Sequence, residues 1–121
     1  MILPKMDSIS VGKSGENIAQ EYLEKKGYNV IDRNYRTKYG EIDLIVKKDG
    51  ILIFVEVRSK TGEQFGTPED TINRIKVRKI QRNAIAYAAR KKWQGQYKID
   101  AICIILNQDN SVKRLDHYEN I

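Results

Sequence analysis

The sequence predicts an α/β fold in which one mixed β-sheet carries helices on both faces, within a single domain of residues 1–121. Residues 40–60 contain two apolar segments around an Asp-Gly pair, as in a β-hairpin. A helical pattern then covers residues 67–92, and a run rich in β-branched residues follows at 98–106. The segment that joins the hairpin to residues 98–106 is long enough for a crossover between parallel strands. The predicted order is therefore helix, three strands, helix, two strands.

The chain is expected to begin with an arm and a helix. Residues 1–12 show no regular pattern and are predicted to form a flexible arm. Apolar residues recur at helical spacing from Ser14 to Lys26, and Gly27 supplies the signal that ends a helix. The segment NVIDRNY, residues 29–35, predicts the first strand.

The hairpin that follows has a register that the sequence defines. The Asp-Gly pair at positions 49–50 is typical of a two-residue turn, which places Asp43 opposite Glu56 and Glu41 opposite Arg58. The alternate face is entirely apolar, so it is predicted to be core. Its residues are Ile42, Leu44, Val46, Ile53, Val55 and Val57.

The second helix is expected to start at Thr67 and Pro68 and to reach about Lys92, with first turns that could be irregular. The segment at 98–106 predicts a buried strand, and VKRLDHY at 112–118 an exposed last strand. The apolar stripe predicted for the helix comprises Ile72, Ile75, Ile80, Ala84, Tyr87 and Ala88.

Composition limits the functional classes. The 22 Lys and Arg residues exceed the 16 acids, which gives a net charge of +6 and favours a polyanionic partner. A single cysteine, Cys103, excludes an intrachain disulfide and a cysteine-cluster zinc site, and its apolar neighbours predict a core position.

His117 is the lone histidine and is expected to be a surface or packing residue. There is no signal-peptide pattern and no apolar run long enough for a membrane span, so no membrane partner and a cytoplasmic location are expected.

Two opposed carboxylates within a sheet need compensation, because like charges directly opposite each other are destabilising. One of the acids could be protonated, the Arg58 cation could offset the charge, or a divalent metal could bridge Asp43 and Glu56. Carboxylates are typical Mg²⁺ ligands, often together with phosphate substrates. The alternative is a salt-bridge cluster of these residues with Glu41 that carries no chemistry. The residues alone leave both interpretations open.

The pattern GEIDLI, an Asp-Gly turn and then FVEVR resembles the YraN-like bacterial family, within the PD-(D/E)xK nuclease and Holliday junction resolvase-like superfamily. The segment SGENIAQEYLEKKGYNVIDRNYR is similar to the opening helix and first strand of that family, so the resemblance covers most of the chain. It implies a restriction-endonuclease-like core. It also implies hydrolysis of DNA phosphodiesters with Mg²⁺ or Mn²⁺, on DNA that could be branched or single-stranded.

The resemblance also implies roles for particular residues. Asp43 and Glu56 would be the metal ligands together with the backbone carbonyl of Val57, and Glu16 would be the acid that such nucleases carry on the first helix. Arg58 stands where the superfamily has lysine. Arginine can stabilise charge on a phosphate but cannot give up its proton, which favours a catalytic role limited to electrostatics.

The expected partner is nucleic acid, namely DNA, and the resemblance to resolvases implies a homodimer. Two other hypotheses remain. One is a binding module that keeps the nuclease fold without cleaving, and the other is a basic scaffold whose acids only balance Arg58. Tyr35 and Tyr39 could stack on unpaired bases. The residues predicted to bind nucleic acid are Arg33, Arg36, Lys60, Lys76 and Lys79.

Overall fold

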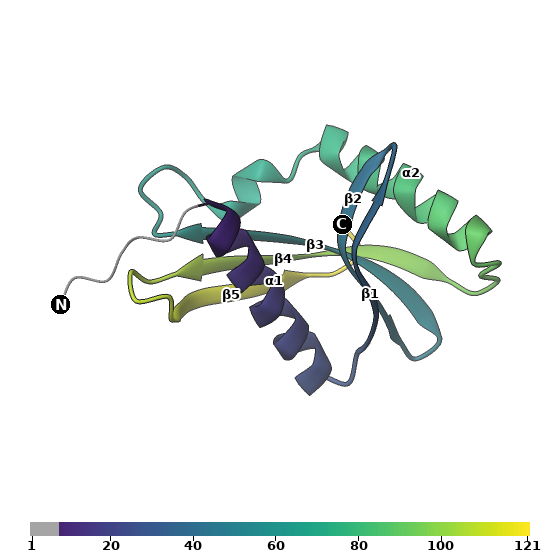
Figure 1. Cartoon of the computed structure of the whole chain (residues 1–121), viewed down its shortest axis with the longest axis horizontal. Coiled ribbons are helices and arrows are strands. Elements are labelled where there is room, and N and C mark those ends of the chain that lie inside the picture. The colour runs from purple at the N-terminus through teal and green to yellow at the C-terminus, as the bar shows by residue number, and fades with distance from the viewer. Residues whose placement is uncertain (1–7) are drawn as a thin grey trace.

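The computed structural model describes the backbone of residues 8–121 and the side chains of residues 14–121. One five-stranded sheet has the order β1-β2-β3-β4-β5, in which β3 and β4 are parallel and the other pairs antiparallel. The predicted α/β class, mixed sheet and element order are confirmed. The elements are α1 (Ser8–Lys25), β1 (Asn29–Thr37), β2 (Gly40–Lys48), β3 (Ile51–Thr61), the 3-10 helix η1 (Pro68–Thr71), α2 (Arg74–Arg90), β4 (Tyr97–Leu106) and β5 (Val112–Tyr118) (Figure 1).

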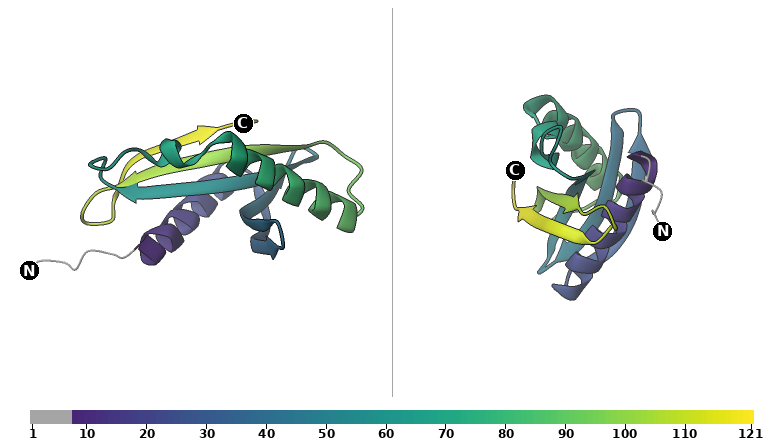
Figure 2. Two further views of the ribbon diagram at one scale, coloured as in Figure 1. Left: turned by 90° about the horizontal axis from the view of Figure 1, so that it is seen from above. Right: turned by 90° about the vertical axis from the view of Figure 1, so that its left-hand side faces the viewer.

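The two α-helices cover opposite faces of the sheet, as Figure 2 shows. Successive residues of β3 explain this arrangement, because side chains alternate between the two faces of a strand. Ile53 and Val55 pack in the cluster that contains Leu23 of α1, whereas Phe54 packs in the cluster that contains Ile80 of α2. Among the described residues, neither helix combines the length and apolar character that crossing a bilayer requires.

The first helix is longer than the sequence predicted. It begins at Ser8 rather than Ser14, so residues 8–12 are helical and the predicted arm is wrong for them. The remainder of that arm, residues 1–7, lies outside the described part of the chain. The predicted stop is confirmed, since Gly27 has a φ of +89°, a conformation that glycine adopts without steric cost.

The second helical region is divided in two. The backbone N–H of Thr67 bonds to the Asp70 carboxylate at 2.9 Å at the start of η1, and Ile72 is then extended. Asn73 restarts the helix, because its side chain accepts a hydrogen bond from the backbone N–H of Lys76 at 2.9 Å. The predicted apolar stripe is therefore wrong at Ile75, which is 66% exposed, because the break resets the helical phase. From Ile80 onward its members are buried.

The hairpin register is confirmed close to the turn and then ends. Asp49 and Gly50 have φ values of +52° and +76°, as a type I′ turn requires, and the predicted pairing is present from Lys48↔Ile51 to Leu44↔Val55. Beyond Leu44, β2 separates from β3. The predicted pairs of Asp43 with Glu56 and of Glu41 with Arg58 do not form, because the ladder ends before them. Ile42 also packs in the cluster on the α2 side instead of with Leu44.

His117 is a packing residue, in agreement with the sequence interpretation. Its ring nitrogens lie 2.8 Å from a carboxylate oxygen of the buried Asp100 and 3.1 Å from the hydroxyl of Tyr22. These contacts connect β4 and β5 to α1. Cys103 is fully buried, as its apolar neighbours predicted.

Candidate metal site at the strand fork

The candidate site lies at the fork where β2 leaves β3. Asp43 is the first residue of β2 beyond the region that pairs with β3. Its Oδ2 accepts a hydrogen bond of 2.8 Å from the backbone N–H of Val57 in β3. The Asp43 carboxylate thus accepts the hydrogen bond that the next backbone carbonyl of β2 would accept if the ladder continued. The divergence of the strands creates the space that this side chain fills.

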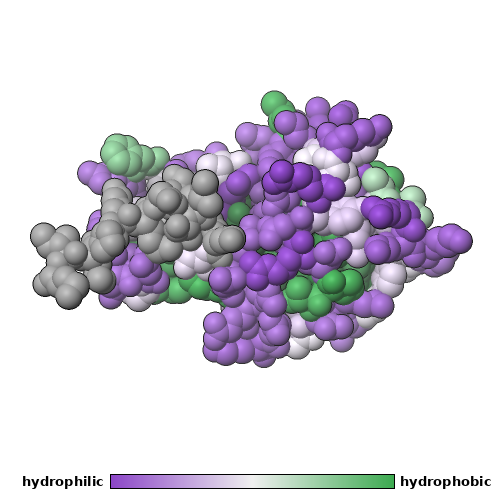
Figure 3. All heavy atoms as spheres, viewed as in Figure 1, coloured by the Kyte–Doolittle hydropathy of each residue, from purple (hydrophilic) through white to green (hydrophobic). Residues whose placement is uncertain are grey.

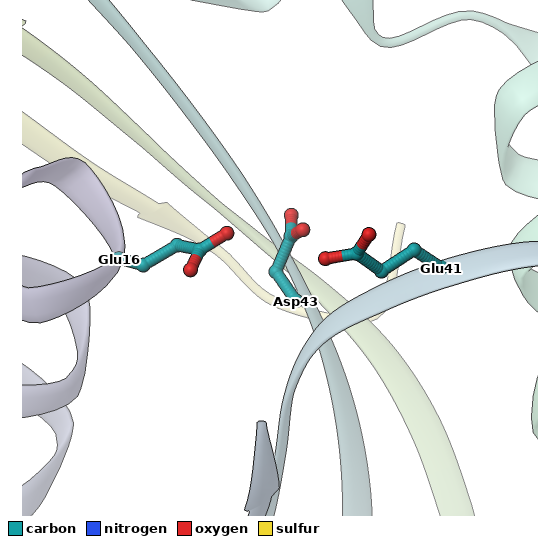
Figure 4. Close-up of side chains that lie close together, drawn as sticks. All are labelled: Glu16, Glu41 and Asp43. Carbon is teal, nitrogen blue, oxygen red and sulfur yellow. The ribbon is translucent and has the colours of Figure 1, made fainter. Parts of the chain in front are cut away.

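Three carboxylates converge at the fork. Glu16 extends from α1, and Glu41 and Asp43 extend from β2 (Figure 4). One oxygen atom of each residue lies within 4.8 Å of the oxygen atoms of the other two. Oxygen ligands of this kind are the ones that Mg²⁺ and Mn²⁺ prefer.

Gly15 allows α1 to bring Glu16 to this place. Gly15 is buried, and a Cβ atom on it would meet the Ser59 side chain of β3, with the Ser59 Cβ only 2.8 Å away. The absence of a side chain therefore lets the first described turns of α1 approach β3 closely. Glu16, the next residue, then points toward the fork.

Burial and like charges disfavour ionisation at the fork. The pKa of Asp43 is raised from 3.8 to about 7, first by burial and then by the negative charge of Glu56, while the Val57 N–H acts in the opposite direction. Burial also raises the pKa of Glu56, against the lowering effects of Arg58 and Lys76. A bound cation would relieve this cost, because a nearby positive charge favours the ionised form of an acid.

Glu56 is 2% exposed and is satisfied on only one of its two oxygens. Its Oε1 lies 2.8 Å from Arg58 Nη2 and 3.6 Å from Lys76 Nζ. Its Oε2 is buried and has no hydrogen-bond partner in the described part of the chain, and neither has Arg58 Nε. A buried carboxylate oxygen without a hydrogen-bond partner is costly, and a cation bound beside Glu56 would satisfy it.

Side chains of β1 neutralise the outer part of the cluster. Arg33 lies 3.4 Å from Glu16 and also donates to Asn17 and Gln20 of α1. Arg36 lies 2.8 Å from Glu41. These contacts balance two of the acids without a metal, as the predicted salt-bridge alternative requires.

Asn34 lies between two of the carboxylates. With its amide nitrogen turned toward them, it donates to Glu41 at 2.8 Å and to Glu16 at 3.1 Å. Its φ of +51° lies in the left-handed region, which asparagine tolerates better than most residues. This conformation allows a residue of β1 to connect α1 and β2 at the site.

The predicted site residues are thus only partly brought together. Glu16 and Asp43 share a cluster with Glu41, whereas Glu56 lies outside this group of three and acts on Asp43 through its charge. Val57 donates its N–H to Asp43, and the metal-binding role of its carbonyl stays a prediction. Glu41 was predicted only as a member of a salt-bridge cluster and not as a candidate metal ligand, although its spacing of two residues from Asp43 in GEID places both on one face of a strand.

The predicted nucleic-acid-binding residues occupy different surroundings. Arg33 and Arg36 contact the acids of the site, and Lys76 contacts Glu56. Lys60 donates to the backbone carbonyl of Phe65 at 3.3 Å, and Lys79 is exposed.

The two tyrosines proposed for base stacking also differ. Tyr35 packs edge-on against Tyr87 at 4.9 Å between ring centroids, and its hydroxyl accepts a hydrogen bond from Arg90. Tyr39 is 40% exposed, so of this pair it is the one whose ring reaches solvent more freely.

The sequence has many relatives. The pattern that defines the Uncharacterised protein family UPF0102 matches residues 15–104. A UPF0102 protein of Pelotomaculum thermopropionicum is 38% identical over 111 residues, which cover 91% of this chain and 92% of that protein. One from Persephonella marina is 42% identical over 84% of this chain and 89% of its own length, and one from Alkaliphilus metalliredigens is 40% identical over 93% and 96%. The YraN-like family expected from the sequence is confirmed, and this chain belongs to the UPF0102 family.

Proposed function

We propose that the protein is a divalent-metal-dependent nuclease-like protein that hydrolyses DNA phosphodiesters. The observation that carries this proposal is the convergence of Glu16, Glu41 and Asp43 within 4.8 Å at the strand fork. The buried Glu56, with one unsatisfied carboxylate oxygen, adds to it. The resemblance of GEIDLI and FVEVR to the PD-(D/E)xK superfamily supports the same chemistry.

In this proposal, Asp43 and the neighbouring glutamates hold Mg²⁺ or Mn²⁺. The metal would polarise a phosphoryl oxygen and lower the pKa of a bound water molecule. The planar guanidinium of Arg58 suits oxyanions, so its role is to stabilise charge on the phosphate and to hold Glu56 in place. Its guanidinium is 2.8 Å from Glu56 and its side chain is 31% exposed, so it is both anchored and accessible.

The second candidate is a nucleic-acid-binding module that does not cleave. It is favoured by arginine at the position where the superfamily has lysine, and by the ion pairs of Glu16 with Arg33 and of Glu41 with Arg36. In that case the acids and arginines at the fork are a structural salt-bridge cluster.

Cleavage assays separate these candidates. Wild type is incubated with junction, flap, single-stranded and duplex DNA in Mg²⁺ or Mn²⁺, beside Asp43→Asn and Glu56→Gln. We expect cleavage by wild type and a decrease of about 100-fold or more in Asp43→Asn. Glu24→Gln, on the exposed face of α1, is the matched control and should cleave like wild type.

Cleavage that persists unchanged in both Asp43→Asn and Glu56→Gln would refute the assignment of the site. Salt-sensitive DNA binding without cleavage by wild type would instead support the binding module.

A further inference from the structure

The positive charge of this protein comes from one segment. The region from Arg74 to Lys92, which is α2 and the two residues after it, contains eight Lys and Arg residues and no acid. The whole chain has 22 basic and 16 acidic residues, so 14 basic and 16 acidic residues remain elsewhere. Outside this segment the chain is slightly acidic. The net positive charge of the chain is therefore concentrated in this segment, which favours α2 as the contact for a polyanion.

The basic residues of α2 face outward. Its apolar side packs on the sheet through Ile80 and Ala84, which leaves Arg78, Lys79 and Arg82 exposed. Within residues 14–121, no carboxylate pairs with any of these three, in contrast to the ion-paired arginines at the fork. In Figure 3 the region that α2 occupies in Figure 1 is mostly hydrophilic, with a few hydrophobic side chains among the hydrophilic ones. A solvated helix face commonly mixes both signs of charge, and this one does not.

An anionic membrane surface suits this face less well than a nucleic acid does. Membrane-surface helices bury a continuous apolar side in the lipid, but the apolar side of α2 is already buried in the protein. The outward face adds only Ile75 and Ile85, which lie almost three helical turns apart.

The same face suits duplex rather than single-stranded DNA. Proteins that bind single strands stack bases on exposed aromatic rings. The one aromatic residue within α2 is Tyr87, which is 3% exposed and belongs to the core. Contacts from this face are therefore expected to reach phosphates, which gives binding that does not depend on sequence.

The helix is also connected to the candidate site. Lys76, in the first turn of α2, lies 3.6 Å from Glu56, and Asn83 donates to the backbone carbonyl of Gly40 at 2.9 Å, beside the turn between β1 and β2. A helix of 17 residues is about 25 Å long, which equals the length of about seven base pairs. A duplex along α2 would thus pass beside the strand fork.

From these observations we infer that the outward face of α2 binds the phosphate backbone of a DNA duplex and holds a duplex arm next to the acid cluster. The inference rests on the proposed function for DNA as the partner, but it does not require cleavage.

Binding measured in EDTA tests this inference separately from catalysis. The affinity for a labelled DNA duplex is followed by fluorescence anisotropy between about 50 and 200 mM salt. The test variant is Arg78→Gln/Lys79→Gln/Arg82→Gln. The control is Lys25→Gln/Lys26→Gln/Lys113→Gln, which removes the same charge from exposed positions outside α2. Circular dichroism and unfolding curves establish that both variants fold.

The test variant is expected to bind at least about tenfold more weakly. Its slope of log K against log salt should be smaller by about 0.9 for each phosphate that the variant no longer neutralises. The control should change affinity by less than about twofold. An equal decrease of affinity in both variants, or an unchanged affinity in the test variant, would overturn the inference.

The two proposals fail in different ways. Wild type that binds through α2 without cleaving in Mn²⁺ would sustain this inference and contradict the nuclease. Wild type that cleaves, while the test variant binds as tightly as wild type, would overturn this inference alone.

Discussion

Asp43 differs from the other acids at the fork because, among the described residues, no cation forms an ion pair with it. Glu16 pairs with Arg33, Glu41 with Arg36, and Glu56 with Arg58 and Lys76. Asp43 instead accepts a hydrogen bond from the uncharged Val57 N–H. Half-buried and surrounded by acids, it is a residue that a bound proton or metal would stabilise.

The raised pKa of Asp43 predicts how the stability of the metal-free protein depends on pH. Since the pKa of Asp43 is about 7 in the folded state and near 3.8 in the unfolded state, folding favours the protonated form. The contribution of protonated Asp43 to the free energy of unfolding is on the order of 2–4 kcal/mol. It is complete below about pH 4 and is lost as the pH rises through about 7. Asp43→Asn should remove most of that pH dependence and be more stable than wild type at pH 8.

Urea denaturation in EDTA at pH 5 and pH 8 provides the measurement. Asp49→Asn, at the exposed turn, is the control and should keep the pH dependence of wild type. If the stability of Asp43→Asn and of wild type decreased equally as pH rises, Asp43 would not be the acid whose pKa is raised by folding.

At the level of elements, the position of Glu16 depends on how closely α1 packs against β3. In an open helix, alanine would be favoured over glycine by about 1 kcal/mol. At position 15, however, an added Cβ would meet Ser59 Cβ at 2.8 Å. We therefore expect Gly15→Ala to destabilise the protein by about 1–3 kcal/mol and to move Glu16 away from the fork.

Thermal or urea unfolding gives the sign of the effect, and NMR shifts of Glu16 and Asp43 report the displacement. Glu24→Ala, on the exposed face of the same helix, is the control. A stabilised Gly15→Ala variant would mean that α1 has room at this position and that the packing argument is wrong.

The sequence predicted the hairpin only as far as local rules apply. The Asp-Gly turn fixes the register near itself, and the predicted register is confirmed from Lys48 to Leu44. It was wrong at Asp43 because the pairing rule assumes an unbroken ladder. The end of the ladder depends on the Asp43–Val57 bond and on Ile42 packing toward α2, which are tertiary contacts. The break at Ile72 and Asn73 likewise had only a weak local signal, namely asparagine as a cap.

Across the whole molecule, the distribution of charge was readable but its geometry was not. The sequence shows eight basic residues and no acid from Arg74 to Lys92, yet only the packed helix shows which of them face outward. Similarly, the acids could be named from the sequence, but Glu41 lies in the cluster because β2 separates from β3 while it remains paired with β1. The fold thereby brings the basic helix to the acids at the fork, with Lys76 of α2 next to Glu56.

The central claim is that the strand fork binds a divalent cation, and Mn²⁺ titration by isothermal calorimetry tests it most directly. Wild type, Asp43→Asn and the Glu24→Gln control are titrated at pH 8, where competition from protons is small. We expect binding heat at millimolar or lower Mn²⁺ for wild type and the control, and none for Asp43→Asn. Absence of heat in wild type, or equal heat in wild type and Asp43→Asn, would contradict a metal site at the fork.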